Sequence, residues 1–329
     1  MNLFLTYDYE LFFGAPTGSV EKCLIEPTDL LREMSKRTGV KMVFFVDTGY
    51  LKQLENFRSK FPKVEAEYQL VKQQIDTLVS EGHDCQLHIH PHWEDSFHTG
   101  ENWQMVTDRY KLVDFSDLEI DKIVTEYADI LGRWTNRPIQ SYRAGGWCLQ
   151  PFNRIKKSLK KIGIKLDSTV FGGGKFTAGN YYYDFTSIPS KSTWRFSDDL
   201  CVEDVNGEFI EYPISNYYYS VFFFWRLFLL GRFQPHLHKP IGDGYPMPSP
   251  GLRKTMLTKG MRLSASMDGY FVTKLNQVVK VNQKRGFNET VILGHPKACT
   301  MFALKKLEEF IEAHKNKHQF ITFQDLAFN

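Results

Sequence analysis

The run Lys41-Met42-Val43-Phe44-Phe45-Val46 decides the fold class of this chain, because apolar side chains follow one another without a polar break after Lys41. Apolar residues on both faces of a strand are typical of a parallel sheet that helices cover on both sides. Similar short runs recur at residues 3–8, 85–88, 141–143, 165–170, 290–293 and 319–323. We therefore predict an α/β fold built around a parallel sheet.

Segments of helical length separate these strands. Pro27 precedes one expected helix, which ends near Gly39. The stretch Ser116-Asp117-Leu118-Glu119 is a capping box, and it opens another helix that runs to about Trp134. Further helices are expected at residues 64–81, after residue 151 and at residues 301–314. This alternation is typical of βαβ units.

The chain length of 329 residues fits one large α/β domain or two smaller ones. The alternation of strands and helices breaks between residues 171 and 260, where glycine runs, several prolines and an aromatic block at residues 217–233 occur. We interpret residues 171–260 as an insertion within a single domain that spans residues 1–329.

Composition argues against several classes of function. Lys and Arg number 41, Asp and Glu number 38, and the net charge is +3, so we expect no nucleic-acid partner. Five scattered cysteines without a CxxC pair indicate free thiols in a reducing compartment. The first residues lack the basic and apolar stretches of a signal peptide, and the expected location is therefore the cytoplasm.

Charged residues lie at the ends of expected strands, where parallel α/β folds carry their active sites. Asp8 and Glu10 are two residues apart and therefore face the same side of an extended chain. They could provide one metal ligand and one general base, or they could be a pair of solvated acids. Arg143 precedes Gly145 and Gly146, and it could approach these carboxylates or a substrate, or be an ordinary surface charge.

Histidines follow two other strands. His88 and His92, with His90 between them, come directly after an apolar run. A pair spaced by four residues can converge on one zinc-like ion if the chain turns at the intervening proline, whereas the alternative is a polar surface loop. His90 could be a ligand, a substrate contact or a support for the ligands. His295 follows another apolar strand and could be a structural residue or the general acid that the other segments lack. Trp147 offers a flat apolar face of the kind that packs on a sugar ring.

These segments, in this order, resemble the motifs of the NodB-homology polysaccharide deacetylases, carbohydrate esterase family 4. The resemblance rests on Thr6-Tyr7-Asp8-Tyr9-Glu10, Gly82-His83-Asp84-Cys85-Gln86-Leu87-His88 with His92, Arg143 with its glycines, Leu166-Asp167-Ser168-Thr169, and Leu293-Gly294-His295. It covers the whole chain in motif order apart from the stretch after Val170. It implies a distorted, seven-stranded (β/α) barrel of the TIM type.

The resemblance also implies a hydrolase that removes the N-acetyl group of an amino sugar in a polysaccharide, oligosaccharide or lipid-linked glycan. One divalent ion, most readily Zn²⁺, would be bound by His88, His92 and a carboxylate. The family has adjacent aspartates where this chain has Asp8 and Tyr9, so we expect Glu10 to be the ligand and Asp8 the base, with exchanged roles as the alternative. The remaining roles follow from the same resemblance: Arg143 orients Asp8, His295 is the general acid, Asp167 orients His295, and His90 and Trp147 contact the substrate.

Two other functions fit the same residues. One is a metal-dependent hydrolase of a small-molecule amide on the same fold. The other is a non-catalytic glycan-binding protein, which the altered first motif suggests. A glycosidase that uses Asp8 and Glu10 is disfavoured, because carboxylates two residues apart on one strand cannot flank a glycosidic bond.

The aromatic block at residues 217–233 is almost wholly apolar but contains Arg226 and Arg232. Its 17 residues are marginal for a transmembrane helix, which needs about 20. We expect either a buried helix that covers the barrel or an interfacial helix at the inner face of a membrane. The interfacial interpretation expects Phe223 and Phe224 to contact the lipid.

Overall fold

The computed structural model of the protein describes residues 1–249 and 251–326. Within these residues the main sheet has nine strands in the order β10-β11-β7-β6-β3-β2-β1-β14, with β15 beside β1. Every neighbouring pair from β11 to β14 in this order is parallel. The strands are β1 (Asn2–Tyr9), β2 (Val43–Asp47), β3 (Asp84–Ile89), β6 (Ser141–Ala144), β7 (Leu166–Asp167), β10 (Trp194–Phe196), β11 (Phe209–Glu211), β14 (Glu289–Gly294) and β15 (Gln319–Phe320).

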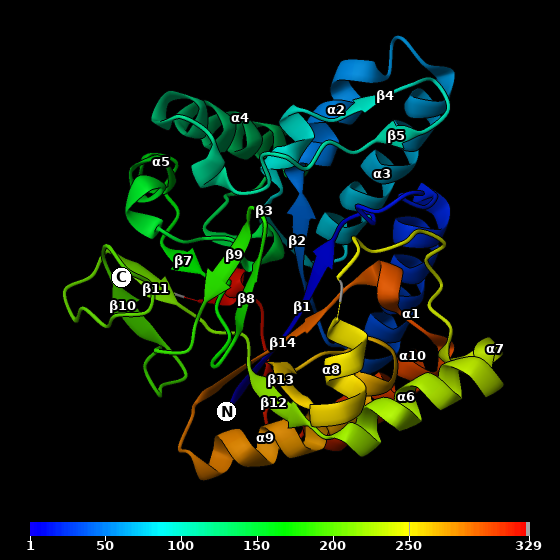
Figure 1. Cartoon of the computed structure of the whole chain (residues 1–329), viewed down its shortest axis with the longest axis vertical. Coiled ribbons are helices and arrows are strands. Elements are labelled where there is room, and N and C mark those ends of the chain that lie inside the picture. The colour runs from blue at the N-terminus through cyan, green and yellow to red at the C-terminus, as the bar shows by residue number, and fades with distance from the viewer. Residues whose placement is uncertain (250, 327–329) are drawn as a thin grey trace.

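The parallel strands curl into a closed barrel. Ile214, just beyond β11, forms one parallel bridge with Val291 of β14 and another with Phe171, just beyond β7. These bridges join the two ends of the run from β11 to β14. In Figure 1, β1, β2 and β3 lie in the middle of the molecule with helices above, below and to the right of them, and β10 and β11 lie at the left edge. The predicted barrel of seven parallel strands is confirmed.

The helices begin and end where local chemistry predicts. Gly39 ends α1 with a left-handed backbone at φ 74°, a conformation that costs glycine little. Ser116 and Glu119 form the expected capping box at the start of α4. The helices are α1 (Glu26–Thr38), α2 (Thr48–Phe57), α3 (Pro62–Ser80), α4 (Asp117–Thr135), α5 (Lys156–Lys161), α6 (Val221–Phe233), α7 (Pro235–His238), α8 (Leu252–Lys259), α9 (Leu275–Lys284) and α10 (Met301–His314).

Strand β2 lies at the centre of the core, as its sequence predicts. All five of its residues are buried, and Phe44 and Phe45 have no exposed surface. Phe44 stacks on Tyr7 of β1, with ring centroids 5.7 Å apart. Burying a phenylalanine side chain contributes about 1.5–3 kcal/mol, so these rings fix the neighbouring strands that carry the polar residues.

Residues 171–260 are only partly an insertion, because β10 and β11 belong to the main sheet. The rest of this stretch forms a β8 (Lys175–Ala178) and β9 (Tyr181–Asp184) hairpin, the strand β12 (Asn216–Tyr219) that pairs with β13 (Met261–Ser264), and helices α6 to α8. The aromatic block is therefore not one helix, since its first residues are in β12 and α6 starts at Val221. Among the described residues, we find no helix with the length and apolarity needed to cross a membrane.

Candidate metal and catalytic site

The two carboxylates at the end of β1 share one buried site. Asp8 belongs to the strand and Glu10 follows it, and both side chains are almost fully buried. Their spacing of two residues turns both toward the carboxyl end of β3, the strand that neighbours β2 in the sheet. The predicted same-face arrangement is therefore present.

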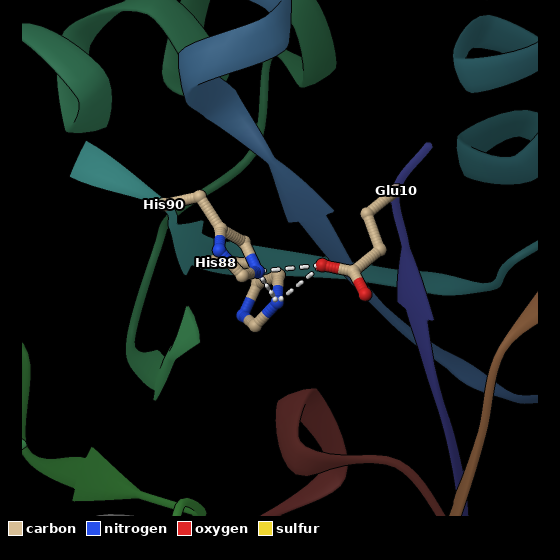
Figure 2. A group of neighbouring side chains, drawn as sticks. All are labelled: Glu10, His88 and His90. Carbon is tan, nitrogen blue, oxygen red and sulfur yellow. Dashed lines mark hydrogen bonds and ion pairs between the residues drawn. The ribbon is translucent and has the colours of Figure 1, made fainter. Parts of the chain in front are cut away.

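Glu10 meets His88 and His90 within this site, and we refer to these three residues as the Glu–His–His group. The Oε2 atom of Glu10 lies 3.2 Å from Nε2 of His88 and 2.6 Å from Nε2 of His90. The two imidazole Nε2 atoms are 3.2 Å apart. Figure 2 shows the carboxylate and both rings pointing toward one another from two sides of the site. Three donor atoms thus converge on one small volume.

The segment from Arg143 to Gly145 lies against both imidazoles. Nδ1 of His88 lies 2.9 Å from the carbonyl oxygen of Arg143, which fixes the proton on Nδ1 and leaves the Nε2 lone pair facing the group. His90 lies against Gly145, where a Cβ atom would come within 2.5 Å of its Nδ1. Gly145, two residues after Arg143, therefore makes room for His90.

The structure does not bring His92 into the Glu–His–His group. Strand β3 ends at Ile89, and the 3-10 helix η2 (Pro91–Glu94) turns His92 away. Its ring stacks on Tyr110 at 5.3 Å, and both ring nitrogens are buried without a hydrogen-bond partner among the described residues. His90 takes the place expected for His92, because residues 88 and 90 face the same side of the extended chain.

Arg143 holds Asp8, as expected. Its Nη1 donates to Oδ1 of Asp8 at 2.7 Å, while its other nitrogens donate to the carbonyl and hydroxyl oxygens of Ser168. The guanidinium also lies over the Phe45 ring, 4.1 Å from its centre. The other Asp8 oxygen, Oδ2, remains 3.9 Å from Nε2 of both His88 and His295.

Asp268, and not Asp167, contacts His295. Oδ2 of Asp268 lies 2.8 Å from Nδ1 of His295, and Oδ1 accepts from the His295 backbone N–H at 2.8 Å. The expected partner, Asp167, instead accepts from the backbone and hydroxyl of Thr169 and contacts Glu211. Asp167 lies on β7, where Thr169 and Glu211 engage its carboxylate, so the assignment of Asp167 to His295 is wrong.

Lys297 is an unexpected cation in the site. Its Nζ donates to Oε1 of Glu10 at 2.8 Å and to the carbonyl oxygen of Leu11 at 2.6 Å, and the side chain is buried. Oε1 of Glu10 is therefore engaged by Lys297, while Oε2 faces the histidines. Lys297 therefore compensates the negative charge of Glu10, and Arg143 compensates that of Asp8.

Burial and neighbouring charges shift the pKa values of the residues in the site. Burial alone would raise the pKa of Glu10, but the Lys297 ammonium and the two imidazoles outweigh it and hold the pKa well below its usual range. Burial lowers the pKa of His90 to about 4. For His88, burial is outweighed by the charges of Asp8 and Glu10, which raise its pKa.

The pKa of His295 depends on burial and on a different set of charges. Burial would lower its pKa, but Asp268, followed by Asp8 and Glu10, outweighs burial and raises it. A raised pKa favours the imidazolium near neutral pH. Its Nε2 lies 3.8 Å from Oε1 of Glu10, so the ring faces the Glu–His–His group.

Aromatic side chains surround the site. Phe13 packs against His90, with ring centroids 4.4 Å apart, and Tyr110 packs against Tyr181 at 5.2 Å. Trp147 packs on Phe171 and Tyr183 and is partly exposed. The contact of Trp147 with a sugar stays a prediction.

The sequence patterns did not predict Asp268 and Lys297 as site residues. Lys297 had a signal, since it comes two residues after His295 at the same strand end. Asp268 had none, because it lies beyond β13 in a stretch without a strand-like pattern. A parallel bridge between Ser266 and Leu293, with a hydrogen bond from the Met267 N–H to the Leu293 carbonyl, brings it to His295.

Comparisons with known proteins support the fold. No protein-family model and no curated protein matches the chain. Among solved structures, Puue allantoinase is similar with a TM-score of 0.52 and 10% identity, covering 98% of this chain and 88% of that one. A "probable polysaccharide deacetylase" from Pseudomonas aeruginosa is similar with a TM-score of 0.51 and 11% identity, over 98% and 88% of the two chains. The chain therefore has the fold expected from its resemblance to the NodB-homology polysaccharide deacetylases.

Proposed function

We propose that this protein is a metal-dependent hydrolase that removes the acetyl group from the nitrogen of an amino sugar. The observation that carries the proposal is that Asp8 and His295 both adjoin the Glu–His–His group: Oδ2 of Asp8 lies 3.9 Å from Nε2 of His88, and Nε2 of His295 lies 3.8 Å from Oε1 of Glu10. Metal ligands flanked by a base and an acid are the parts that hydrolysis of an unactivated amide requires.

The donor set of the Glu–His–His group fits a divalent ion of the zinc type. Ligands about 2.0–2.1 Å from a tetrahedral Zn²⁺ lie roughly 3.3 Å from one another, and two of the three donor separations here are 3.2 Å. Two imidazole nitrogens and one carboxylate oxygen are also a donor set that Zn²⁺ accepts. We therefore assign the ligand roles to Glu10, His88 and His90. When bound, the ion would polarise the acetamide carbonyl and lower the pKa of water from about 16 toward about 7.

The remaining residues act on the protons of the reaction. Asp8, oriented by Arg143, accepts a proton from the water that adds to the carbonyl carbon. The bond between this carbon and the sugar nitrogen then breaks, and His295 donates its proton to the departing nitrogen. This donation is needed because an amide anion is a poor leaving group. The products are acetate and the free amino sugar.

The exposed fractions of the side chains in the site support a substrate of which only a small part enters the site. The side chains of His295 and Asp268 are each 20% exposed, whereas that of His88 is 1% exposed. The site is therefore open on the side of the acid and closed on the side of the ligands. An acetyl group that enters from this side would leave its nitrogen, and the sugar attached to it, next to His295.

A small-molecule amide remains a second candidate substrate. The similarity of the fold to an allantoinase equals its similarity to a polysaccharide deacetylase. The fold therefore does not favour either substrate over the other. The partial opening at His295 favours the glycan, since a small amide could be enclosed completely.

Metal content tests the proposal and distinguishes the proposed enzyme from a glycan-binding protein without catalysis. Wild-type protein should purify with one divalent ion per chain, whereas His88→Ala and His90→Ala should lose it. The matched control is His92→Ala, which removes a neighbouring buried imidazole and should keep the ion. Loss of the ion in His92→Ala together with full occupancy in His90→Ala would overturn the ligand assignment, and absence of any ion from the wild type would overturn the proposal.

A further inference from the structure

Helix α6 has apolar side chains on two opposite faces. One face packs against the protein, where Phe223 and Phe224 are buried and Phe223 contacts Tyr219 at 4.8 Å and Tyr270 at 5.3 Å between ring centroids. The expectation that Phe223 and Phe224 would contact a lipid is therefore wrong, because both are core residues. Their burial also fixes which face of α6 points outward.

The outward face of α6 carries an aromatic and aliphatic stripe. Its members are Phe222, Trp225, Leu229 and Phe233, which are 86%, 49%, 47% and 72% exposed. Successive members are three or four residues apart in the sequence. Because an α-helix turns by about 100° per residue, side chains at these spacings lie in one row along the helix. Exposed apolar side chains are ordinary when single, but a continuous row of them indicates an interaction surface.

Basic residues are frequent in the segment that contains this stripe. Between residues 221 and 262 there are seven of them: Arg226, Arg232, Lys239, Arg253, Lys254, Lys259 and Arg262. Asp243 is the one acidic residue of this stretch, and its carboxylate accepts from the backbone and hydroxyl of Ser19. In residues 1–249 and 251–326, no carboxylate lies within 4.0 Å of any of the seven basic groups. The segment that contains α6 therefore carries basic groups that no carboxylate of the described residues pairs with.

We propose that α6 docks the protein on an anionic lipid surface, with the stripe among the acyl chains and the basic residues at the headgroups. An aromatic row bordered by Arg226 and Arg232 matches the division of a bilayer interface into apolar and charged layers. Lysines are depleted at protein interfaces, yet they occur here at three positions. A second copy of the chain is a poor occupant, because a symmetric contact would bring two positive surfaces together.

The docking helix is connected closely to the candidate site. From α6 the chain passes through α7 to residues 241–245, where the Gly242 N–H donates to the carbonyl of Lys297 at 3.1 Å. The Tyr245 N–H donates to the carbonyl of Pro16, in the loop that follows Glu10. Docking would thus hold the loops of the site near the membrane surface. The docking itself is independent of the proposed chemistry.

Vesicle co-sedimentation of the full chain tests this proposal. The probes are phosphatidylcholine vesicles with and without phosphatidylglycerol, at low and high salt. Wild type should bind only the anionic vesicles and should dissociate at high salt. The double variant Phe222→Ser with Phe233→Ser should weaken binding by about tenfold for each ring removed. Leu118→Ser is the matched control, since Leu118 is also 86% exposed but lies on α4.

A charge variant tests the electrostatic part. Arg226→Glu with Arg232→Glu should abolish binding, whereas Lys157→Glu with Lys165→Glu, of equal charge change and exposed elsewhere, should reduce it far less. Asp8→Asn should bind like wild type, which separates docking from catalysis. The proposal is overturned if wild type ignores anionic vesicles, if the Phe222 and Phe233 changes leave binding intact, or if they instead abolish a dimer in sedimentation velocity.

Discussion

Replacing Asp268 by Asn should change the acid step and leave the metal ligands untouched. In the wild type Asp268 accepts from Nδ1 of His295 and from the His295 backbone N–H, both at 2.8 Å. The two donors contact different oxygens of Asp268, and an asparagine keeps an acceptor oxygen at only one of these two positions. Its NH₂ group would face either the imidazole or the backbone N–H, and neither position provides a bond to the imidazolium as strong as the carboxylate bond.

The size of the effect follows from this contact. A hydrogen bond to a charged group contributes about 1.5–3 kcal/mol. Because about 1.4 kcal/mol corresponds to a factor of ten in rate, Asp268→Asn should lower kcat/KM on an acetamide by roughly 10- to 150-fold. Asp268 raises the pKa of His295, so its replacement lowers that pKa. Activity requires protonated His295, and the alkaline limb of the pH profile should therefore move to lower pH.

Two measurements check this prediction. The first is kcat/KM on both sides of neutral pH for wild type, Asp268→Asn and the control Asp167→Asn, with metal content measured in each. The second is an NMR titration of the His295 ring, which needs no substrate. The control should keep the alkaline limb in place, because Asp167 contacts Thr169 and not His295. An unmoved limb in Asp268→Asn, or a limb that moves only in Asp167→Asn, would refute the assigned role.

Three further predictions address other parts of the site and core. His295→Ala should keep the metal and lose most turnover on an amide, but it should affect an acetate ester with a good leaving group much less; equal losses on both substrates would argue against the acid role. Metal affinity, measured by calorimetry, should fall as pH decreases through the raised pKa of His88, because the proton then competes with the ion, and an affinity independent of pH would contradict this. Phe44→Ala should lower the free energy of unfolding in urea by about 3–5 kcal/mol, whereas Leu118→Ala, at an exposed position, should change it by less than about 0.5 kcal/mol; similar effects would contradict the assignment of β2 to the core.

The sequence predicted those parts of the fold that short-range patterns determine. The apolar run that forms β2 and the capping box that starts α4 specify their elements locally, and the structure contains both. The contact between Asp8 and Arg143 could also be predicted from the sequence, because each residue lies near the end of a strand of the same parallel sheet. Strand ends in such a sheet meet at one edge, whatever the loops between them do.

The parts that could not be predicted depend on tertiary contacts. The choice between His90 and His92 depends on where β3 gives way to η2, and an extended or a turned chain at Pro91 fits the sequence equally well. Asp268 reaches His295 through the bridge between Ser266 and Leu293, and Ser266 lies in a stretch where the sequence shows no strand-like pattern. The two faces of α6 are equally apolar in sequence, so only packing reveals that Phe223 is buried and Phe222 is exposed.

Acetate release from a panel of N-acetylated glycans tests the central claim most directly. Protein stripped of metal by a chelator would be assayed before and after addition of Zn²⁺, beside Zn²⁺-loaded Asp8→Asn as the matched variant. We predict that the wild type releases one acetate for each free amine formed, only after Zn²⁺ is added, and that Asp8→Asn releases almost none. Equal acetate release by the stripped protein or by Asp8→Asn, or no release from any N-acetylated sugar by the loaded wild type, would contradict the account.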